Sequence, residues 1–223
     1  MKLNIKELLD FFDDKKDSFK GDANAIMSIL GEDLNSAVYK HFRKNKVEIL
    51  EDSVVSGMKK GKWLDKWMLD GKTLYQCEIK NWASTSLLGK QLRSDASEEE
   101  IKEVVKYHWD HELNIRFSKK VEHPNNVTKV LLKMKPPKEL NKLKIEPLVI
   151  YWMPISSSLN PLSVLPIKTL HLPIKTEFSE LQIFSVSLYL HQLYKNGKGE
   201  KFIELDMPHF EHRMKILNKL QNK

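Results

Sequence analysis

Two strand-like runs on either side of Asp70-Gly71 limit the fold of this chain more than any other feature. The first run covers 62–69 and the second covers 72–82. Asp-Gly between two such runs is a strong signal for a two-residue hairpin turn. If Asp70 and Gly71 form the turn, Leu69 pairs with Lys72, and every other opposed pair follows from that register. The sequence therefore predicts an antiparallel hairpin in the first half of the chain.

The predicted hairpin gathers polar and charged side chains on one face of its sheet. Opposed residues point to the same face, and side chains alternate along each strand. In this register Asp65 faces Gln76, and Trp63 faces Glu78. The polar residues that share the face are Asp65, Gln76, Glu78 and Lys80. Asp65 and Glu78 are diagonal neighbours with Cα atoms roughly 7–8 Å apart, so their carboxylates can converge on one divalent cation.

Two carboxylates beside a lysine suit the hydrolysis of phosphodiesters. Mg²⁺ prefers oxygen ligands, usually one or two carboxylates together with waters and phosphate oxygens of the substrate. Such a metal activates a water molecule and neutralises the charge that develops on the phosphate. A lysine at the same place, such as Lys80, can orient the attacking water or stabilise the charge of the transition state.

This set of residues resembles the active-site core of the PD-(D/E)XK nuclease superfamily, which has the restriction-endonuclease-like fold. Asp65 matches the metal-binding aspartate of the family, and Glu78-Ile79-Lys80 matches its Glu-x-Lys motif. By this resemblance the backbone carbonyl of Ile79 is a further metal ligand, and Gly31-Glu32 in a preceding helix supplies a helical carboxylate. The resemblance extends from about residue 22 to 113, which is roughly half of the chain.

The resemblance implies an α/β fold with a restriction-endonuclease-like core, in which a central mixed β-sheet carries the catalytic hairpin and is flanked by helices. It implies a deoxyribonuclease that depends on Mg²⁺ or Mn²⁺, and leaves open whether it acts as an endonuclease or an exonuclease. The implied catalytic residues are Glu32, Asp65, Glu78 and Lys80. The implied metal ligands are Asp65, Glu78 and Ile79. DNA is the expected partner, RNA stays open as a substrate, and so does a homodimer that cuts both strands of a duplex.

Other interpretations of the same residues stay open. Asp65, Glu78 and Lys80 could lie on a solvated sheet face joined by a cross-strand salt bridge. Three tryptophans share that face, namely Trp63, Trp67 and Trp82. They speak against full solvation, and an acid pair among tryptophans is unfavourable unless something compensates it. In the preceding helix, helical angles place Asp33 nearer the apolar stripe than Glu32, so Asp33 is the substitute for the helical carboxylate.

Two further functions compete with nuclease activity. A PD-(D/E)XK fold can grip nucleic acid or a protein partner without cleavage, as a catalytically silent binding module. The third interpretation is an interaction protein whose acidic helix, 98–112, docks on a basic partner. Neither of these needs a divalent cation, so metal binding separates both from the nuclease.

The rest of the chain predicts a single α/β domain over residues 1–223. Its core covers about 22–153, and short strands and helices elaborate it over 154–223. Apolar spacing predicts one helix that contains 5–12 and further helices at about 22–44, 97–113, 178–194 and 208–221. The predicted strands besides the hairpin lie at about 46–56, 127–134, 147–153 and 202–205.

Positive charge is concentrated in one part of the chain. There are 37 basic and 30 acidic residues, with a net charge of +7 and a pI near 9.2. Eight lysines stand against two glutamates between 119 and 144, whereas acids dominate 98–112. This unevenness predicts a basic side that contacts phosphates. The candidate nucleic-acid-binding residues are Lys59, Lys60, Lys62, Lys129, Lys133, Lys135 and Lys138. Strand alternation would place Lys129, Lys133 and Lys135 on one side of their run.

Several protein classes are disfavoured by composition. The single cysteine, Cys77, cannot form an intramolecular disulfide or a cysteine-based zinc site. No apolar run approaches the roughly 18 residues of a membrane span, and the first residues lack the apolar stretch of a secretory signal. We therefore expect a cytoplasmic protein with no membrane partner. The His209 and His212 pair lacks an evident third ligand, so zinc is not expected there.

Overall fold

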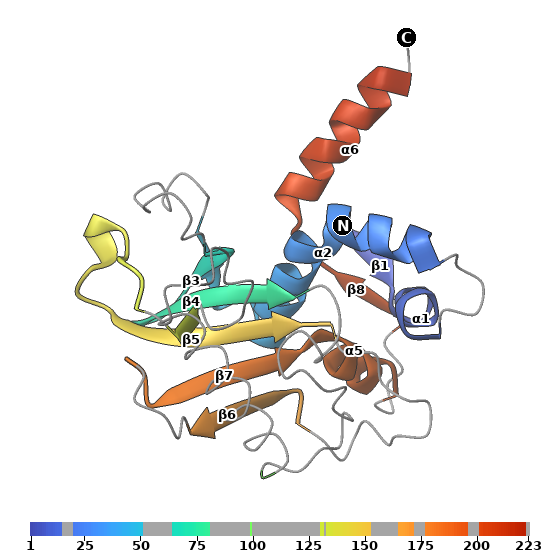
Figure 1. The fold of residues 1–223 in the computed structure, drawn as a ribbon. Coiled ribbons are helices and arrows are strands. Elements are labelled where there is room, and N and C mark those ends of the chain that lie inside the picture. Colours follow the sequence, from blue (N-terminus) through green and yellow to red (C-terminus); the bar gives the residue numbers. More distant parts are fainter. Residues whose placement is uncertain are drawn as a thin grey trace, which may run out of the picture.

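The computed structural model describes residues 1–14, 20–50, 64–80, 99, 130–131, 133–152, 165–171, 177–195 and 201–221. Within this part of the chain, a mixed β-sheet of six strands forms the centre of the molecule (Figure 1). In spatial order its strands are β2 (Glu48–Ile49), β3 (Lys66–Asp70), β4 (Thr73–Lys80), β5 (Lys144–Tyr151), β7 (Glu180–Ser185) and β6 (Ile167–His171). The predicted α/β class, with a central mixed sheet flanked by helices, is confirmed.

The sheet combines an antiparallel meander with a parallel half. Strand β3 runs antiparallel to both of its neighbours, β2 and β4, while β5 lies parallel to β4 and β7 lies parallel to β5. Strand β6 closes the far edge, antiparallel to β7. Helices α2 (Lys20–Phe42) and α5 (Val186–Lys195) share one buried hydrophobic cluster with β3, β4 and β5. Both helices therefore pack against the same face of the sheet.

Helix α2 is fixed by apolar side chains at helical spacing. Its buried apolar residues are Leu34, Ala37, Val38 and Tyr39. They belong to the same cluster as Cys77 and Ile79 of β4. The helix ends at Phe42, and Lys44 and Asn45 then have φ values of 54° and 58°, the left-handed conformation that commonly follows a helix. The predicted helix at 22–44 is confirmed.

The hairpin of β3 and β4 has a different turn from the predicted one. Asp70 pairs with Thr73. The two turn residues are therefore Gly71 and Lys72. Gly71 has a φ of +60°, which glycine adopts without the steric cost of a Cβ, and a glycine at the first turn position fits a type II′ turn. The predicted pairing of Leu69 with Lys72 is wrong by two residues, an even shift that leaves every side chain on its predicted face.

The segment predicted as one helix over 178–194 divides into β7 and α5. Leu181, Ile183 and Phe184 are buried in β7, which lies between β5 and β6. A short apolar run cannot be distinguished from part of a buried helix by its periodicity. The helix prediction is therefore wrong for 180–185 and confirmed for most of the remainder. The predicted strand at 147–153 is confirmed as the second half of β5.

The strand predicted at 127–134 is wrong at the residues that the structure describes. Val130 and Leu131 lie in a 3-10 turn, and 133–137 has no regular structure. The 3-10 helix η4 (Lys138–Leu140) then leads into β5. The backbone groups of this segment bond to a buried side chain of β4, as shown below, so it does not form a ladder with a strand.

The two ends of the described chain pair in a second, two-stranded sheet. Strand β1 (Lys2–Asn4) runs antiparallel to β8 (Phe202–Glu204), which confirms the strand predicted near 202–205. Helix α1 (Ile5–Leu9) and the π-helix η1 (Asp10–Asp14) follow β1 directly. Strand β1 was not predicted, because three residues are too few to show an alternating pattern.

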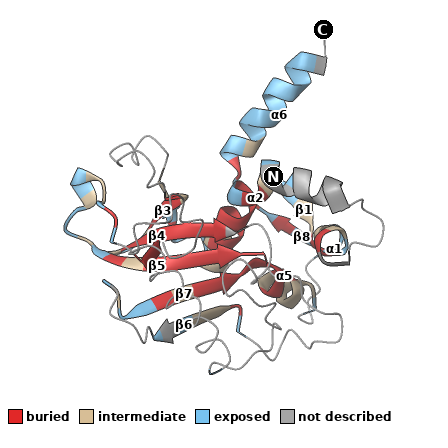
Figure 2. Cartoon of the chain, viewed as in Figure 1, coloured by how far each residue is buried: buried red, intermediate tan, exposed pale blue. Residues whose placement is uncertain are grey.

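Helix α6 (Pro208–Gln221) projects from the body of the molecule and leaves most of its residues exposed (Figure 2). The predicted C-terminal helix is confirmed. No helix in the described ranges is both long and apolar enough to cross a membrane. The predicted acidic helix at 97–113, apart from residue 99, and the predicted strand beyond residue 50 lie outside the described residues.

Candidate metal and nucleic-acid site

Asp65 lies just before β3, and its carboxyl group is held at the backbone of β4. The Ile79 N–H donates a hydrogen bond to Asp65 Oδ2, with 2.6 Å between the two atoms. This N–H belongs to the peptide between Glu78 and Ile79, so the Asp65 carboxyl group lies beside the Glu-x-Lys segment. The N–H and C=O of a strand residue point toward the same neighbouring strand. The Ile79 carbonyl therefore faces this side as well.

Glu78 lies on the sheet face that points away from α2. The pair of Trp67 and Gln76 defines this face, and Glu78 follows Gln76 by two positions. Glu78 is only 3% exposed. A second hydrophobic cluster covers the face and contains Leu64, Trp67, Leu74, Met134 and Ile145. The alternative of a solvated sheet face is therefore wrong at Glu78.

The strand register brings the two acids to the same level of the hairpin. Lys66 pairs with Cys77 at the start of β3, so one further step places Asp65 opposite Glu78. Electrostatics agree with this position of Asp65. Burial raises the pKa of the Cys77 thiol well above its usual value, and the charge of the nearby Asp65 carboxylate adds to the increase. The structure thus gathers Asp65, Glu78 and the Ile79 peptide at one end of the hairpin.

Gln76 joins the segment after Val130 to the same strand. The Gln76 side chain is fully buried, and its amide donates to the Val130 carbonyl. Its side-chain oxygen accepts from the Met134 N–H, with 3.1 Å between the atoms. Sequence analysis had treated Gln76 only as a polar neighbour of the site. A lone glutamine between apolar strand residues was the available signal, but its partners, 54 and 58 residues away, cannot be identified from the sequence.

We expect Gln76→Leu to destabilise the fold by about 2–4 kcal/mol, because the Val130 carbonyl and the Met134 N–H would be left buried without a partner. Gln76→Glu should also destabilise the fold, because a buried carboxylate would face the Val130 carbonyl and lie two positions from Glu78. Urea unfolding of the parent and both variants measures these losses. Equal stability of Gln76→Leu and the parent would contradict the role of Gln76 in holding this segment.

Among the described side chains, helix α2 contributes no carboxylate to the acid pair. Glu32 is exposed, whereas Asp33 is buried. Among the described residues, no group of three or more His, Cys, Asp or Glu side chains is placed to hold a metal ion. Neither helical acid therefore forms such a group with Asp65 and Glu78. Lys80 is the last residue of β4 and pairs with Tyr151 of β5; only its backbone is described.

The candidate DNA-contacting lysines divide into described and undescribed residues. Lys133, Lys135 and Lys138 are exposed on the segment that leads into β5. The Lys133 N–H donates to Glu177 Oε2 at 3.1 Å, which fixes the backbone at this point. The candidates outside the described residues are Lys59, Lys60, Lys62 and Lys129.

The atoms gathered at the hairpin fit a hard divalent cation. Asp65 and Glu78 offer carboxylate oxygens, and Ile79 offers a carbonyl oxygen. Mg²⁺ and Mn²⁺ prefer such ligands, and Mg²⁺ commonly keeps waters and substrate phosphates in its remaining positions. Cys77, which would favour a softer metal, lies in the cluster on the opposite face.

The reactivity of the single thiol, Cys77, can be used to detect metal binding at this site without any mutation. Because it is buried and its pKa is raised, we expect the native protein to react with a thiol reagent far more slowly than the unfolded protein. Mn²⁺ should slow the reaction further, because binding to the native state alone reduces opening. The measurement is the rate of thiol modification in the presence of Mn²⁺ and in the presence of EDTA. Equal modification rates in the two conditions would contradict metal binding beside Cys77.

Comparison with protein-family models, with curated proteins and with solved structures finds no match to this chain.

Proposed function

We propose that this protein is a divalent-metal-dependent nuclease that hydrolyses phosphodiester bonds in DNA. One observation carries the proposal. The Asp65 carboxyl group is hydrogen-bonded to the Glu78–Ile79 peptide, beside the buried carboxyl group of Glu78. Burial of carboxylates is unfavourable unless a partner compensates their charge. Mg²⁺ or Mn²⁺ bound between the two acids would use both carboxylates as ligands.

The order of the elements supports the proposal by analogy of fold. Helix α2 precedes the antiparallel meander of β2, β3 and β4, and β5 lies parallel to β4. Asp65 comes from the start of β3 and Glu78 from β4, joined by one hairpin. This order supports the proposal by analogy with the PD-(D/E)XK nucleases that the hairpin residues resemble. A fold alone does not determine an activity, so the site residues have to carry the chemistry.

In the proposed reaction, each residue of the hairpin has a separate task. Asp65, Glu78 and the Ile79 carbonyl hold the metal, whose chemistry is to activate water and neutralise charge on the phosphate. The Ile79 N–H fixes the orientation of the Asp65 carboxyl group, as hydrogen bonds to metal-binding carboxylates commonly do. Lys80 orients the water or stabilises charge on the phosphate. Glu32 is exposed on α2, and no step is assigned to it.

The lysines after Val130 supply the proposed grip on DNA. Gln76 binds the Val130 carbonyl and the Met134 N–H, so the beginning of the basic segment is held against the strand that carries Glu78. Lys133 and Lys135 flank the bonded Met134 and are exposed. Contacts from such lysines to phosphates give affinity that does not depend on base sequence.

Cleavage assays with purified protein test this function. Supercoiled, linear and single-stranded DNA would each be incubated with Mg²⁺, Mn²⁺ or EDTA. We expect nicked or shortened products with either metal and none with EDTA. Cleavage in EDTA would contradict the metal-dependent mechanism. Tight DNA binding with no cleavage under any condition would favour the catalytically silent binding module.

A further inference from the structure

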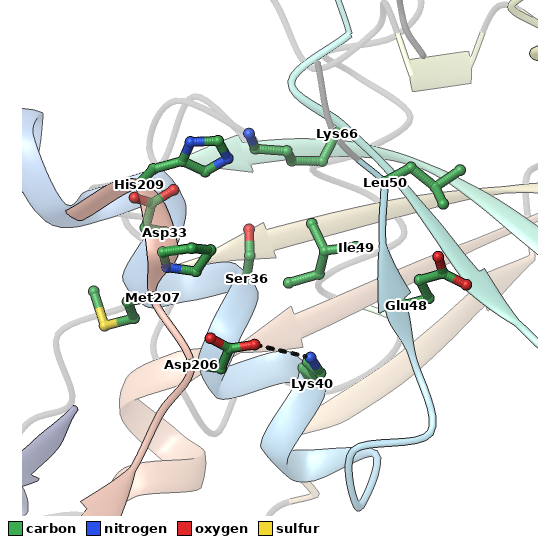
Figure 3. Close-up of a pocket in the computed structure, with 11 residues that line it drawn as sticks. Asp33, Ser36, Lys40, Glu48, Ile49, Leu50, Lys66, Asp206, Met207 and His209 are labelled. Atoms are coloured by element: carbon green, nitrogen blue, oxygen red, sulfur yellow. Dashed lines mark hydrogen bonds and ion pairs between the residues drawn. The ribbon is translucent and has the colours of Figure 1, made fainter. Parts of the chain in front are cut away.

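A pocket of about 190 Å³ lies between α2, β2, the start of β3 and the segment that leads into α6 (Figure 3). Its α2 wall carries Asp33, Ser36 and Lys40, which share one helix face because they are spaced by three and four residues. Lys66 lines the pocket from β3 and directly follows Asp65 in the chain. The pocket is therefore next to the proposed metal site but on the other face of β3.

Asp33 gives this pocket an acceptor that the fold does not use. Asp33 is 7% exposed. Its Oδ2 is buried, and no hydrogen-bond partner for that atom exists among the described residues. Leaving such an acceptor unsatisfied costs about 1–3 kcal/mol. A ligand with an N–H group facing Asp33 would recover this energy.

Ser36 adds a second acceptor one helical turn further along the same wall. Its hydroxyl donates to the Glu32 carbonyl, with 2.6 Å between the two oxygens. The hydrogen is therefore committed to the helix, and the lone pairs of Ser36 Oγ are left to accept. The α2 wall thus presents two acceptors, Asp33 Oδ2 and Ser36 Oγ.

The other walls present charged and polar side chains together with apolar surface. Glu48, Asp206 and His209 line the pocket, and Lys40 pairs with Asp206. The Lys66 ammonium group is a donor, and Lys66 is only 4% exposed. Figure 3 shows Lys66 approaching from the side opposite Asp33. Ile49 of β2, together with Met207 and Pro208, supplies apolar surface. The volume is below the roughly 300 Å³ at which pockets for drug-sized ligands begin, so it suits a single planar ring system.

We propose that this pocket binds a guanine base. The pairing edge of guanine carries two adjacent donors, N1–H and the 2-amino group, followed by the O6 acceptor. The two donors match Asp33 and Ser36, and O6 matches Lys66. Adenine and cytosine carry one amino group on this edge, and thymine carries one N–H between two carbonyls, so none of them offers two adjacent donors.

In the DNA substrate this guanine would be an unstacked base of the same strand as the cleaved phosphodiester, a step that rests on the proposed function. Enzymes that act on nucleic acids accommodate such bases in pockets with polar edges and apolar walls. Lys66 follows Asp65 directly, so the pocket and the proposed metal site share the start of β3.

Binding of free deoxynucleoside monophosphates in EDTA tests the pocket without requiring cleavage. By nuclear magnetic resonance titration, dGMP should bind more tightly than dIMP, which lacks the 2-amino group, by roughly tenfold. dGMP should also bind more tightly than dAMP, dCMP and dTMP. Equal affinity for dGMP and dIMP would overturn the guanine assignment, whether or not the protein cuts DNA.

Two variants test whether dGMP binds in this pocket. Asp33→Asn keeps the size of the side chain but should weaken dGMP binding by roughly tenfold or more, because a neutral amide oxygen is a weaker acceptor than a carboxylate oxygen. Glu48→Gln, at an exposed position on the same pocket, should leave dGMP binding unchanged. Asp33→Asn should also unfold at a temperature no lower than the parent, since Asp33 Oδ2 accepts no hydrogen bond from the described residues. Unchanged dGMP binding by a folded Asp33→Asn variant would overturn the proposal.

Discussion

Glu78→Gln and Asp65→Asn should each reduce DNA cleavage by at least about 100-fold. Losses of this size are typical when an enzyme loses one group that stabilises the charge of the transition state. Both substitutions keep the size of the side chain and remove its negative charge. Loss of either charge weakens the hold on the cation, and Asp65→Asn also loses the acceptor charge opposite the Ile79 N–H. Because both acids act through one metal, the double variant should lose little beyond the singles. Lys80→Ala should fail in the same assay.

A matched control separates this effect from general damage to the sheet. Glu146 is a partly buried glutamate of β5 whose carboxyl group pairs with Lys144. Its register partner is Tyr75, on the face opposite Glu78. Glu146→Gln should therefore cleave DNA like the parent. If folded Glu78→Gln and Asp65→Asn variants also cut DNA like the parent, these two residues do not form the catalytic site.

Replacing Lys133, Lys135 and Lys138 by glutamine should weaken DNA binding and flatten its dependence on salt. Each phosphate contact that is removed reduces the slope of log affinity against log salt by about one unit, so three contacts give a change of about three. All three lysines are exposed, and the segment that carries them is anchored by Gln76. Metal affinity should stay unchanged, because none of the three belongs to the hairpin.

The control for this triple variant removes the same charge elsewhere. Lys46, Lys195 and Lys201 are also exposed but lie outside the basic segment. Their replacement by glutamine should leave the salt slope close to that of the parent. An unaltered slope in the first variant would show that DNA approaches another surface, with Lys59, Lys60 and Lys62 as the next candidates.

The alternating pattern of the hairpin was enough to predict which side chains share a face, but not which residues pair. Faces depend on whether positions are odd or even, so an error of two residues left Gln76 and Glu78 on the predicted side. The turn itself depends on local backbone conformation. Gly71 takes the first turn position with a positive φ, and the prediction had placed it second.

Contacts between distant parts of the chain were beyond local patterns. Gln76 forms hydrogen bonds with residues more than 50 positions away. Backbone groups of the segment predicted as a strand at 127–134 make these hydrogen bonds instead of pairing with another strand. Strand β7 was predicted as helix, because its short apolar run is compatible with either structure until its neighbours β5 and β6 are known. Glu32, the helical carboxylate that the resemblance implied, is exposed, whereas Asp33, named as its substitute from the helical angle, is buried. Its position in a pocket with Lys66 required the structure.

Binding of Mn²⁺ measured by calorimetry tests the central claim most directly, because it asks whether Asp65 and Glu78 share a cation without requiring any DNA. The parent and Glu146→Gln should bind Mn²⁺ with the same affinity, whereas Asp65→Asn and Glu78→Gln should bind it much more weakly or lose it. Mn²⁺ binding by Glu78→Gln that equals that of the parent, or no binding by the folded parent, would contradict the account.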